Sequence, residues 1–172
     1  RLVSPRQWIS EVNWPLREGP HSPAGKSVAV DEESQADFLV RYYLLAGATG
    51  LVERIDWWQL VAKGYGLCDP EASGTLRERP AFRAMATLIR ELGGTTCHGA
   101  LADPDLPGGA RALRFTREDR EIVVAWSTAG AVDWVPASAP GRVAGRDGGE
   151  EPLASAAYRL LASPRYFIRV LR

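Results

Sequence analysis

The chain has 172 residues, 45% of them hydrophobic, which is enough to bury a core in one large domain or two small ones. Its 21 basic residues balance 21 acidic ones, so the sequence shows neither the charge of a nucleic-acid-binding surface nor a polybasic membrane patch. No apolar run approaches the roughly 20 residues that would cross a bilayer, and no signal peptide is visible.

The first predicted element is a short buried strand that begins near Gln7 and reaches Glu11. Asn13 and Trp14 follow it, and Pro15 ends it because proline cannot donate to a sheet ladder. An acid at the carboxyl end of a strand, followed by a long loop, is how a β/α barrel presents a catalytic group. A solvated loop residue is the more common case, so this segment alone leaves both interpretations of Glu11 open.

A loop and a helix come next. Residues 16–30 are rich in Pro, Gly, Ser and His without any period, which predicts a surface loop. Asp31 is a suitable N-cap for a helix that we expect to run from Asp31 to Ala46, with apolar side chains at helical spacing. Gly47 and Gly50 are expected to end it.

The second predicted strand, Leu51 to Leu60, carries charges on both faces. Such residues are tolerated in a parallel barrel only if they are paired or line a site. Strand, helix and strand together make a βαβ unit. The residues that stand out are two tryptophans and three charged side chains: Trp57, Trp58, Glu53, Arg54 and Asp56.

Beyond this unit the pattern changes from helical to alternating. Val61 to Arg79 is expected to be a loop, and Pro80 opens a helix that Gly93 and Gly94 end. After residue 95 a period of two predicts short strands near residues 113–116, 121–127, 132–135, 142–144, 158–161 and 166–171. The sequence therefore predicts an α/β domain over residues 1–94 and a small antiparallel β-sandwich over residues 95–172.

Four stretches, taken in order, are similar to a known family. The segments WISEVNW, GLVERIDWWQL, GYGLCDP and RERPAFRAMATLI resemble the last quarter of a clan A glycoside hydrolase barrel, most of all the β-xylosidase and α-iduronidase type of family 39 and the related family 5. The resemblance covers about residues 8–92 by motif, and the remainder only by architecture. It implies the C-terminal part of a (β/α)8 TIM barrel followed by a β-sandwich.

The resemblance implies roles for particular residues. Glu11 matches the nucleophile, and Trp58, or its neighbour Trp57, matches the position where a sugar ring stacks. A retaining glycosidase uses one carboxylate to attack the anomeric carbon and a second, about 5 Å away, to protonate the leaving oxygen. Other residues just past the strand ends are as well explained by a structural role as by contact with sugar hydroxyls: Asn13, Trp14 and Gln59.

The chain departs from the family at the second carboxylate. The acid/base of that clan belongs to the fourth barrel strand, normally after an Asn, and no such strand precedes Glu11. Asp56 is the best internal candidate, ahead of Asp69 and Glu53, yet an ion pair of Asp56 with Arg54 or Arg41 is the better interpretation. We therefore expect the acid/base on a missing N-terminal part. The start at Arg1, with a strand within ten residues, likewise predicts an internal cut, and the cellular location stays open with the cytoplasm slightly favoured.

No cofactor is implied. Cys68 and Cys97 lack metal-ligand spacing and are expected to be free buried thiols, and His21 and His98 are isolated loop or surface residues. The expected ligand is a carbohydrate, with no nucleic acid or membrane partner. The remaining expected partner is the missing part of the barrel, or a second copy that takes its place.

Three functions stay open from the sequence. The first is the C-terminal portion of a retaining glycoside hydrolase, inactive as this piece alone. The second is a carbohydrate-binding or structural piece that serves association only. The third is a parent barrel that has lost activity and acts as a sugar sensor.

Overall fold

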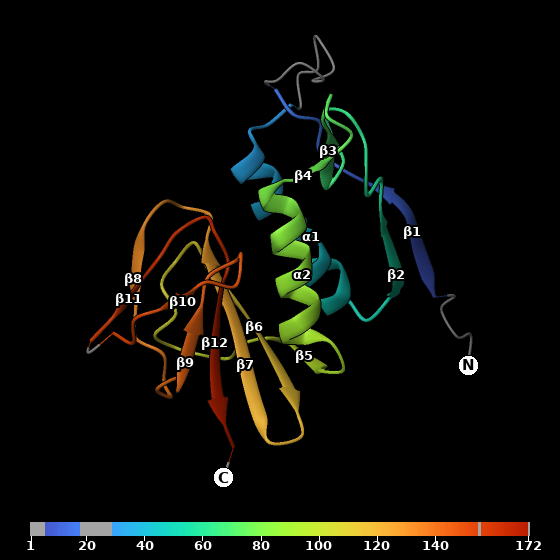
Figure 1. The fold of residues 1–172 in the computed structure, drawn as a ribbon. Coiled ribbons are helices and arrows are strands. Elements are labelled where there is room, and N and C mark those ends of the chain that lie inside the picture. Colours follow the sequence, from blue (N-terminus) through green and yellow to red (C-terminus); the bar gives the residue numbers. More distant parts are fainter. Residues whose placement is uncertain (1–5, 18–28, 155, 172) are drawn as a thin grey trace. The chain divides into compact units, whose positions relative to one another are not determined.

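This computed structural model describes residues 6–17, 29–154 and 156–171, and the chain divides into two units, Arg1–Ala86 and Thr87–Arg172 (Figure 1). The division lies inside a helix rather than in a linker. The assignment of residues 1–94 to part of a barrel and of residues 95–172 to a sandwich remains a prediction.

The first unit is built on two parallel strands. β1 (Gln7–Val12) pairs with β2 (Val52–Trp57), with Ile9 opposite Ile55 and Val12 opposite Trp57. The strand predicted over Leu51 to Leu60 is therefore shorter than expected. The prediction of a buried first strand is wrong, because β1 residues are exposed or half-buried and Trp8 is 65% exposed. In the described part of the chain β1 pairs with β2 alone, so it has no neighbour on its other side.

Helix α1 (Glu32–Ala48) connects the two strands and completes the predicted βαβ unit. The Asp31 side chain accepts a hydrogen bond from the Ser34 amide at 2.6 Å, and this bond holds the pKa of the Asp31 carboxyl below its usual value. The helix ends two residues later than predicted, with Gly47 inside its last turn. The buried side chains face one side: Gln35, Ala36, Leu39, Val40 and Leu44.

A short hairpin replaces the loop predicted over Val61 to Arg79. β3 (Cys68–Pro70) and β4 (Leu76–Glu78) pair antiparallel, with Asp69 opposite Arg77. The prediction missed it because three-residue strands carry no usable alternation. The hairpin is tied to the segment that follows β2 by the Cys68 amide, which donates to the Leu60 carbonyl at 2.8 Å.

Helix α2 (Pro80–Leu92) begins and ends where the sequence predicted. Pro80 occupies the first helical position, where a missing amide hydrogen costs nothing. Gly93 donates to the Ile89 carbonyl at 2.8 Å, and Gly94 adopts a φ of 73°, which ends the helix in the left-handed region that glycine favours.

The second unit contains a six-stranded sheet in the order β10-β9-β12-β7-β6-β5, antiparallel throughout. Two strands in it, β5 and β10, were not predicted, and the others fall close to their predicted positions. β8 and β11 form a separate two-stranded sheet. The strands are β5 (Thr96–Ala100), β6 (Ala110–Arg117), β7 (Arg120–Ser127), β8 (Val132–Trp134), β9 (Arg142–Ala144), β10 (Glu150–Glu151), β11 (Tyr158–Leu160) and β12 (Arg165–Val170).

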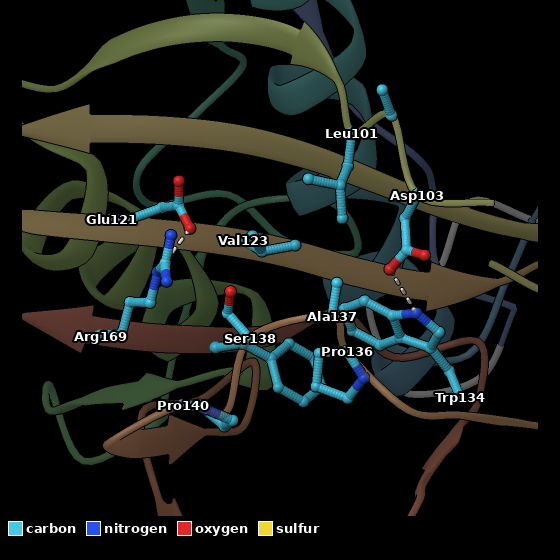
Figure 2. A pocket seen from close by; sticks show the side chains of 12 residues that line it. Leu101, Asp103, Glu121, Val123, Trp134, Pro136, Ala137, Ser138, Pro140 and Arg169 are labelled. Atoms are coloured by element: carbon cyan, nitrogen blue, oxygen red, sulfur yellow. Dashed lines mark hydrogen bonds and ion pairs between the residues drawn. The ribbon is translucent and has the colours of Figure 1, made fainter. Parts of the chain in front are cut away.

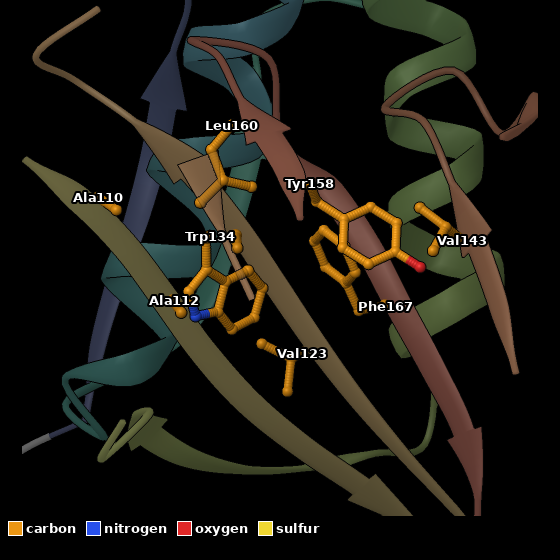
Figure 3. Close-up of a cluster of buried hydrophobic side chains, with 9 residues drawn as sticks. Ala110, Ala112, Val123, Trp134, Val143, Tyr158, Leu160 and Phe167 are labelled. Carbon is orange, nitrogen blue, oxygen red and sulfur yellow. The ribbon is translucent and has the colours of Figure 1, made fainter. Parts of the chain in front are cut away.

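A hydrophobic core joins these two sheets (Figure 3). Phe167 of β12 lies between two aromatic rings of the smaller sheet, 5.2 Å from Trp134 and 5.0 Å from Tyr158 by ring centroids, both edge-on. Edge-to-face aromatic pairs of this kind add stability beyond the area they bury. The β8–β11 sheet is thus held on one face of the six-stranded sheet.

Candidate functional site

The candidate site lies where β1 and β2 end. Parallel strands place their carboxyl ends at one edge of a sheet, so the residues after both strands come together. Two hydrogen bonds join them: the Trp58 amide donates to the Val12 carbonyl at 3.1 Å, and Asn13 Nδ2 donates to the Trp58 carbonyl at 2.8 Å. The structure therefore gives Asn13 a structural contact.

Glu11 is an exposed side chain close to the end of β1. It makes neither a hydrogen bond nor an ion pair among the described residues. Its carboxylate is therefore open to a ligand that approaches this edge.

The other acids considered from the sequence are held by arginines. Arg54 Nε donates to both carboxylate oxygens of Asp56 at 2.9 Å, which confirms the predicted ion pair and assigns it to Arg54. Glu53 accepts from Arg6 at 3.0 Å and from the Trp8 indole at 3.2 Å, and these bonds hold its pKa low. Asp69 lies 3.0 Å from Arg79.

Four aromatic side chains form a cluster beside this edge. Trp14 packs against Phe38 and Tyr42 of α1, with centroid distances of 5.5 and 5.6 Å, and against Trp57 at 6.1 Å. Trp14 and Trp57 are accordingly half-buried. They belong to the packing of α1 on the strand ends.

Trp58 differs from its neighbour Trp57 because 43% of it is exposed. A sugar-stacking residue needs an open ring face, so of the two tryptophans left open by the sequence the exposure favours Trp58. The peptide bond between Trp58 and Gln59 is cis. Gln59 is half-buried, and its carbonyl accepts from the Leu67 amide at 3.0 Å.

Gln35 organises the loops that follow both strands, and the sequence did not suggest it. This α1 residue is fully buried, and its Nε2 donates to the carbonyl of Trp14 at 2.7 Å and to that of Tyr65 at 3.3 Å. The only available signal was an amide on the apolar face of the helix. A buried amide there requires backbone partners from elsewhere in the chain.

Tyr43 links α1 to β2. Its hydroxyl donates to the Ile55 carbonyl at 3.2 Å. Burial, and secondarily the nearby Asp56 carboxylate, raises the pKa of Tyr43 to about 12. Tyr43 is therefore a neutral donor at physiological pH.

No metal centre is evident in the part of the chain that the structure describes, where no group of three or more His, Cys, Asp or Glu side chains comes together. Both cysteines are free, but only Cys68 is buried, and burial raises its thiol pKa. Cys97 is half-buried, which corrects its prediction as a buried thiol. His98 is exposed and contacts the Thr116 hydroxyl at 2.7 Å, while His21 lies outside the described residues. No helix among the described residues is long and apolar enough to cross a membrane.

Comparison with known proteins found similarity in structure only. No protein-family model matches the sequence, and neither does any curated protein. A GH30 endoxylanase from Clostridium papyrosolvens C71 has a similar structure, with a TM-score of 0.60 at 14% identity over 95% of this chain. The family 30 subfamily 8 xylanase Xyn30A from Clostridium acetobutylicum has a TM-score of 0.64 at 12% identity over 94% of this chain.

This chain has the fold of part of those enzymes. It spans 41% of the length of each, and the match extends over both of its units. The glycoside hydrolase relationship expected from the sequence is thus supported at the level of fold. The narrower resemblance to families 39 and 5 is not supported, because both of these structures belong to family 30.

Proposed function

We propose that this chain is the C-terminal portion of a retaining glycoside hydrolase that cleaves O-glycosidic bonds through a glycosyl-enzyme intermediate on Glu11. One observation carries the proposal. Glu11 is exposed and unpaired at the carboxyl end of β1, while Glu53, Asp56 and Asp69 are held in ion pairs. The fold shared with two GH30 xylanases supports it.

In the proposed reaction a Glu11 carboxylate oxygen forms a bond to the anomeric carbon as the bond to the leaving oxygen breaks. An acid residue on a part of the protein outside this chain gives its proton to that oxygen. Water then attacks the anomeric carbon, the glycosyl–Glu11 bond breaks, and the same residue, now a base, takes the proton from water. This chain supplies the nucleophile, and no metal or organic cofactor takes part in these steps.

Trp58 is proposed to carry the sugar. Its exposed ring offers an apolar face for the C–H groups of a pyranose or furanose ring, next to the end of the strand that bears Glu11. Asn13 fixes the Trp58 main chain through its side-chain amide. The residues around this edge are held by buried contacts: Trp14 packs against Trp57, and Gln35 donates to the Trp14 carbonyl.

The test uses the whole parent protein and an activated 2-fluoro glycoside, which slows hydrolysis of the glycosyl-enzyme. We expect mass spectrometry to find the label on a peptide that contains Glu11. A Glu11→Gln variant should lose turnover by several orders of magnitude while it keeps sugar binding, and Glu150→Gln, at an exposed β10 residue, is a control for surface charge. A label on another residue under turnover conditions would reject Glu11 as the nucleophile. If the whole parent protein hydrolyses no glycoside, the alternative of an inactive barrel that acts as a sugar sensor would be favoured.

The unpaired edges of β1 and β2 favour a second candidate function, in which this chain serves to associate with another part of the protein or with a second copy. Among the described residues β1 and β2 pair only with each other, and strand edges without partners are sites for pairing with another chain. We therefore propose that the missing barrel part, or a second copy, covers these edges. Sedimentation of the 172-residue chain tests this: concentration-dependent oligomers are expected, and a stable monomer at all concentrations would contradict it.

A further inference from the structure

The second unit contains a pocket that is separate from the strand ends described above. The pocket has a volume of about 80 Å³ and lies on the face of the six-stranded sheet that also carries the core (Figure 2). Val123 of β7 and Phe167 of β12, opposite each other in the sheet register, contribute to its floor. Its walls come from the segment after β5, at Leu101 to Asp103, and from the segment after β8, at Pro136, Ala137, Ser138 and Pro140.

One end of the pocket carries the Glu121 carboxylate, which is bonded to Arg169 of the lining and to Arg114 outside it. Glu121 is 8% exposed and accepts from Arg169 Nε at 2.8 Å and from Arg114 Nε at 2.5 Å. In the described part of the chain these are the only side-chain bonds of the two arginines, and both use Nε. The terminal amino groups of Arg169, which lines the pocket, therefore remain available to an acceptor oxygen.

The other end carries a carboxylate without a cation. Asp103 accepts from the Trp134 indole at 3.1 Å and from the Asp105 amide at 2.9 Å, and no ion pair of Asp103 occurs among the described residues. A carboxylate can accept up to about four hydrogen bonds, so Asp103 has capacity for a donor from a ligand. The buried Trp134, 1% exposed, fixes the position of this carboxylate.

These groups define the chemistry of a ligand. Asp103, Glu121 and Arg169 line the pocket, and Arg114, which lies outside the lining, balances the remaining charge through its bond to Glu121, so the four groups together are neutral and favour a neutral molecule over an ion. Figure 2 shows apolar side chains, among them Leu101, Val123 and Ala137, between the Arg169 end and the Asp103 end. An amino-acid zwitterion, whose charges are adjacent, does not match groups separated in this way. A sugar ring has hydroxyls on opposite sides and apolar C–H groups between them.

We propose that this pocket binds one neutral sugar residue, with a ring hydroxyl donating to Asp103 and a ring or hydroxyl oxygen accepting from Arg169. The volume equals that of about two to three waters, so the pocket takes the edge of one ring rather than a length of chain. The sugar binds in this pocket whether or not Glu11 is the nucleophile. The choice of a sugar as the ligand rests in part on the proposed function, because the proposed substrate is also a carbohydrate.

The test is a titration of the isotope-labelled 172-residue chain with methyl β-D-xylopyranoside and methyl β-D-glucopyranoside. The indole N–H of Trp134 reports on the site directly because it is bonded to Asp103. We expect a saturable shift of this resonance, with a Kd in the millimolar range for at least one of the two probes. No saturable shift with either probe would overturn the proposal. So would tighter binding of D-glucuronate or D-glucosamine, because a charged ligand is not expected to be preferred.

Variants locate the binding. Asp103→Asn and Arg169→Met should each weaken it by about tenfold, the loss expected for one charge-assisted hydrogen bond. Asp133→Asn, at an exposed β8 residue that does not line the pocket, is the matched control and should leave the Kd unchanged. Equal Kd values in all three variants would overturn the proposal.

A second pair of variants avoids the ion network, so that a folding defect cannot imitate a loss of binding. Ala137 lies exposed at the pocket, and Ala139 lies exposed in the same segment without lining it. Ala137→Trp should abolish the shift by filling the pocket, whereas Ala139→Trp should preserve it. Binding that survives Ala137→Trp would overturn the assignment to this pocket. Failure of these tests would leave the Glu11 proposal unaffected, because its readout is labelling at the other unit.

Discussion

Asn13 and Trp58 are joined across the ends of β1 and β2 by a hydrogen bond of 2.8 Å from the Asn13 side-chain amide to the Trp58 carbonyl. The Trp58 amide in turn donates to the Val12 carbonyl. The residue after one strand thus fixes the main chain of the residue after the other. This places an exposed tryptophan beside the end of the strand that bears Glu11.

Replacement of Asn13 by Ala should loosen this connection. A hydrogen bond of this kind contributes about 0.5–1.5 kcal/mol, so amide hydrogen exchange in residues 57–60 should become several times faster. Mass spectrometry of exchanged peptides measures this. Ser10→Ala, a small change at an exposed β1 residue, is the control and should not alter exchange there. Equal exchange in both variants would show that the bond does not order Trp58.

Arg79 supports the β3–β4 hairpin from inside the first unit. It is 1% exposed, its Nη1 donates to the Gly66 carbonyl at 2.7 Å, and its Nη2 lies 3.0 Å from Asp69. Arg79→Met should lower the free energy of unfolding by about 1–3 kcal/mol, because the Gly66 carbonyl loses its donor and Asp69 keeps only Arg77, 3.6 Å away, as an ion-pair partner.

The matched control for Arg79 is Arg83→Met. The Arg83 side chain is 65% exposed and its ion-pair partner, Glu78, is 3.9 Å away. Its loss should change the free energy of unfolding by no more than about 0.5 kcal/mol. Urea unfolding followed by tryptophan fluorescence compares the two, and similar losses in both variants would contradict a special role for Arg79.

Stability should depend on pH through Glu121. Burial alone would raise the pKa of this carboxyl, but the hydrogen bonds from Arg114 and Arg169 outweigh burial and bring its pKa below 4.5. The stabilisation is therefore complete above pH 4.5, the unfolded value, and is lost as the pH falls through the lower folded value.

Urea unfolding at a series of pH values tests this dependence. The difference in free energy of unfolding between the native chain and Glu121→Gln should be largest near neutral pH and shrink below pH 4.5. Asp119→Asn, at an exposed turn residue with a side chain 60% exposed, is the control and should show little difference at any pH. A gap for Glu121→Gln that persists unchanged to low pH would reject this explanation.

The elements that could be predicted are those with local signals. Asp31 caps α1 through a bond to Ser34, three residues away, and Pro80 starts α2 with its own ring geometry. The placement of Glu11, Asn13 and Trp58 at one edge also followed from the sequence, since a βαβ unit brings the carboxyl ends of its strands together. Local chemistry and topology were sufficient for these features.

The features that were missed depend on residues far apart in the chain. Gln35 holds the carbonyls of Trp14 and Tyr65, which lie 21 and 30 residues away. The hairpin of β3 and β4 is stabilised by Arg79 rather than by its own short strands. The exposure of β1 depends on which strands pair with it, and no pattern within residues 7–12 records that pairing.

Gly66 is a position where a single added methyl group should destabilise the fold. A Cβ there would lie 2.4 Å from the Ala62 amide nitrogen, and neither Ala62 nor Gly66 can move away without disturbing the bonds that Arg79 donates to their carbonyls. Gly66→Ala should lower the free energy of unfolding by about 1–3 kcal/mol.

Gly47→Ala is the opposite case, because a Cβ in the last turn of α1 meets nothing within 4 Å. This substitution should raise the free energy of unfolding by about 0.5–1 kcal/mol. Urea unfolding of both variants decides the matter, and a neutral Gly66→Ala would mean that the turn before β3 yields more readily than its contacts indicate.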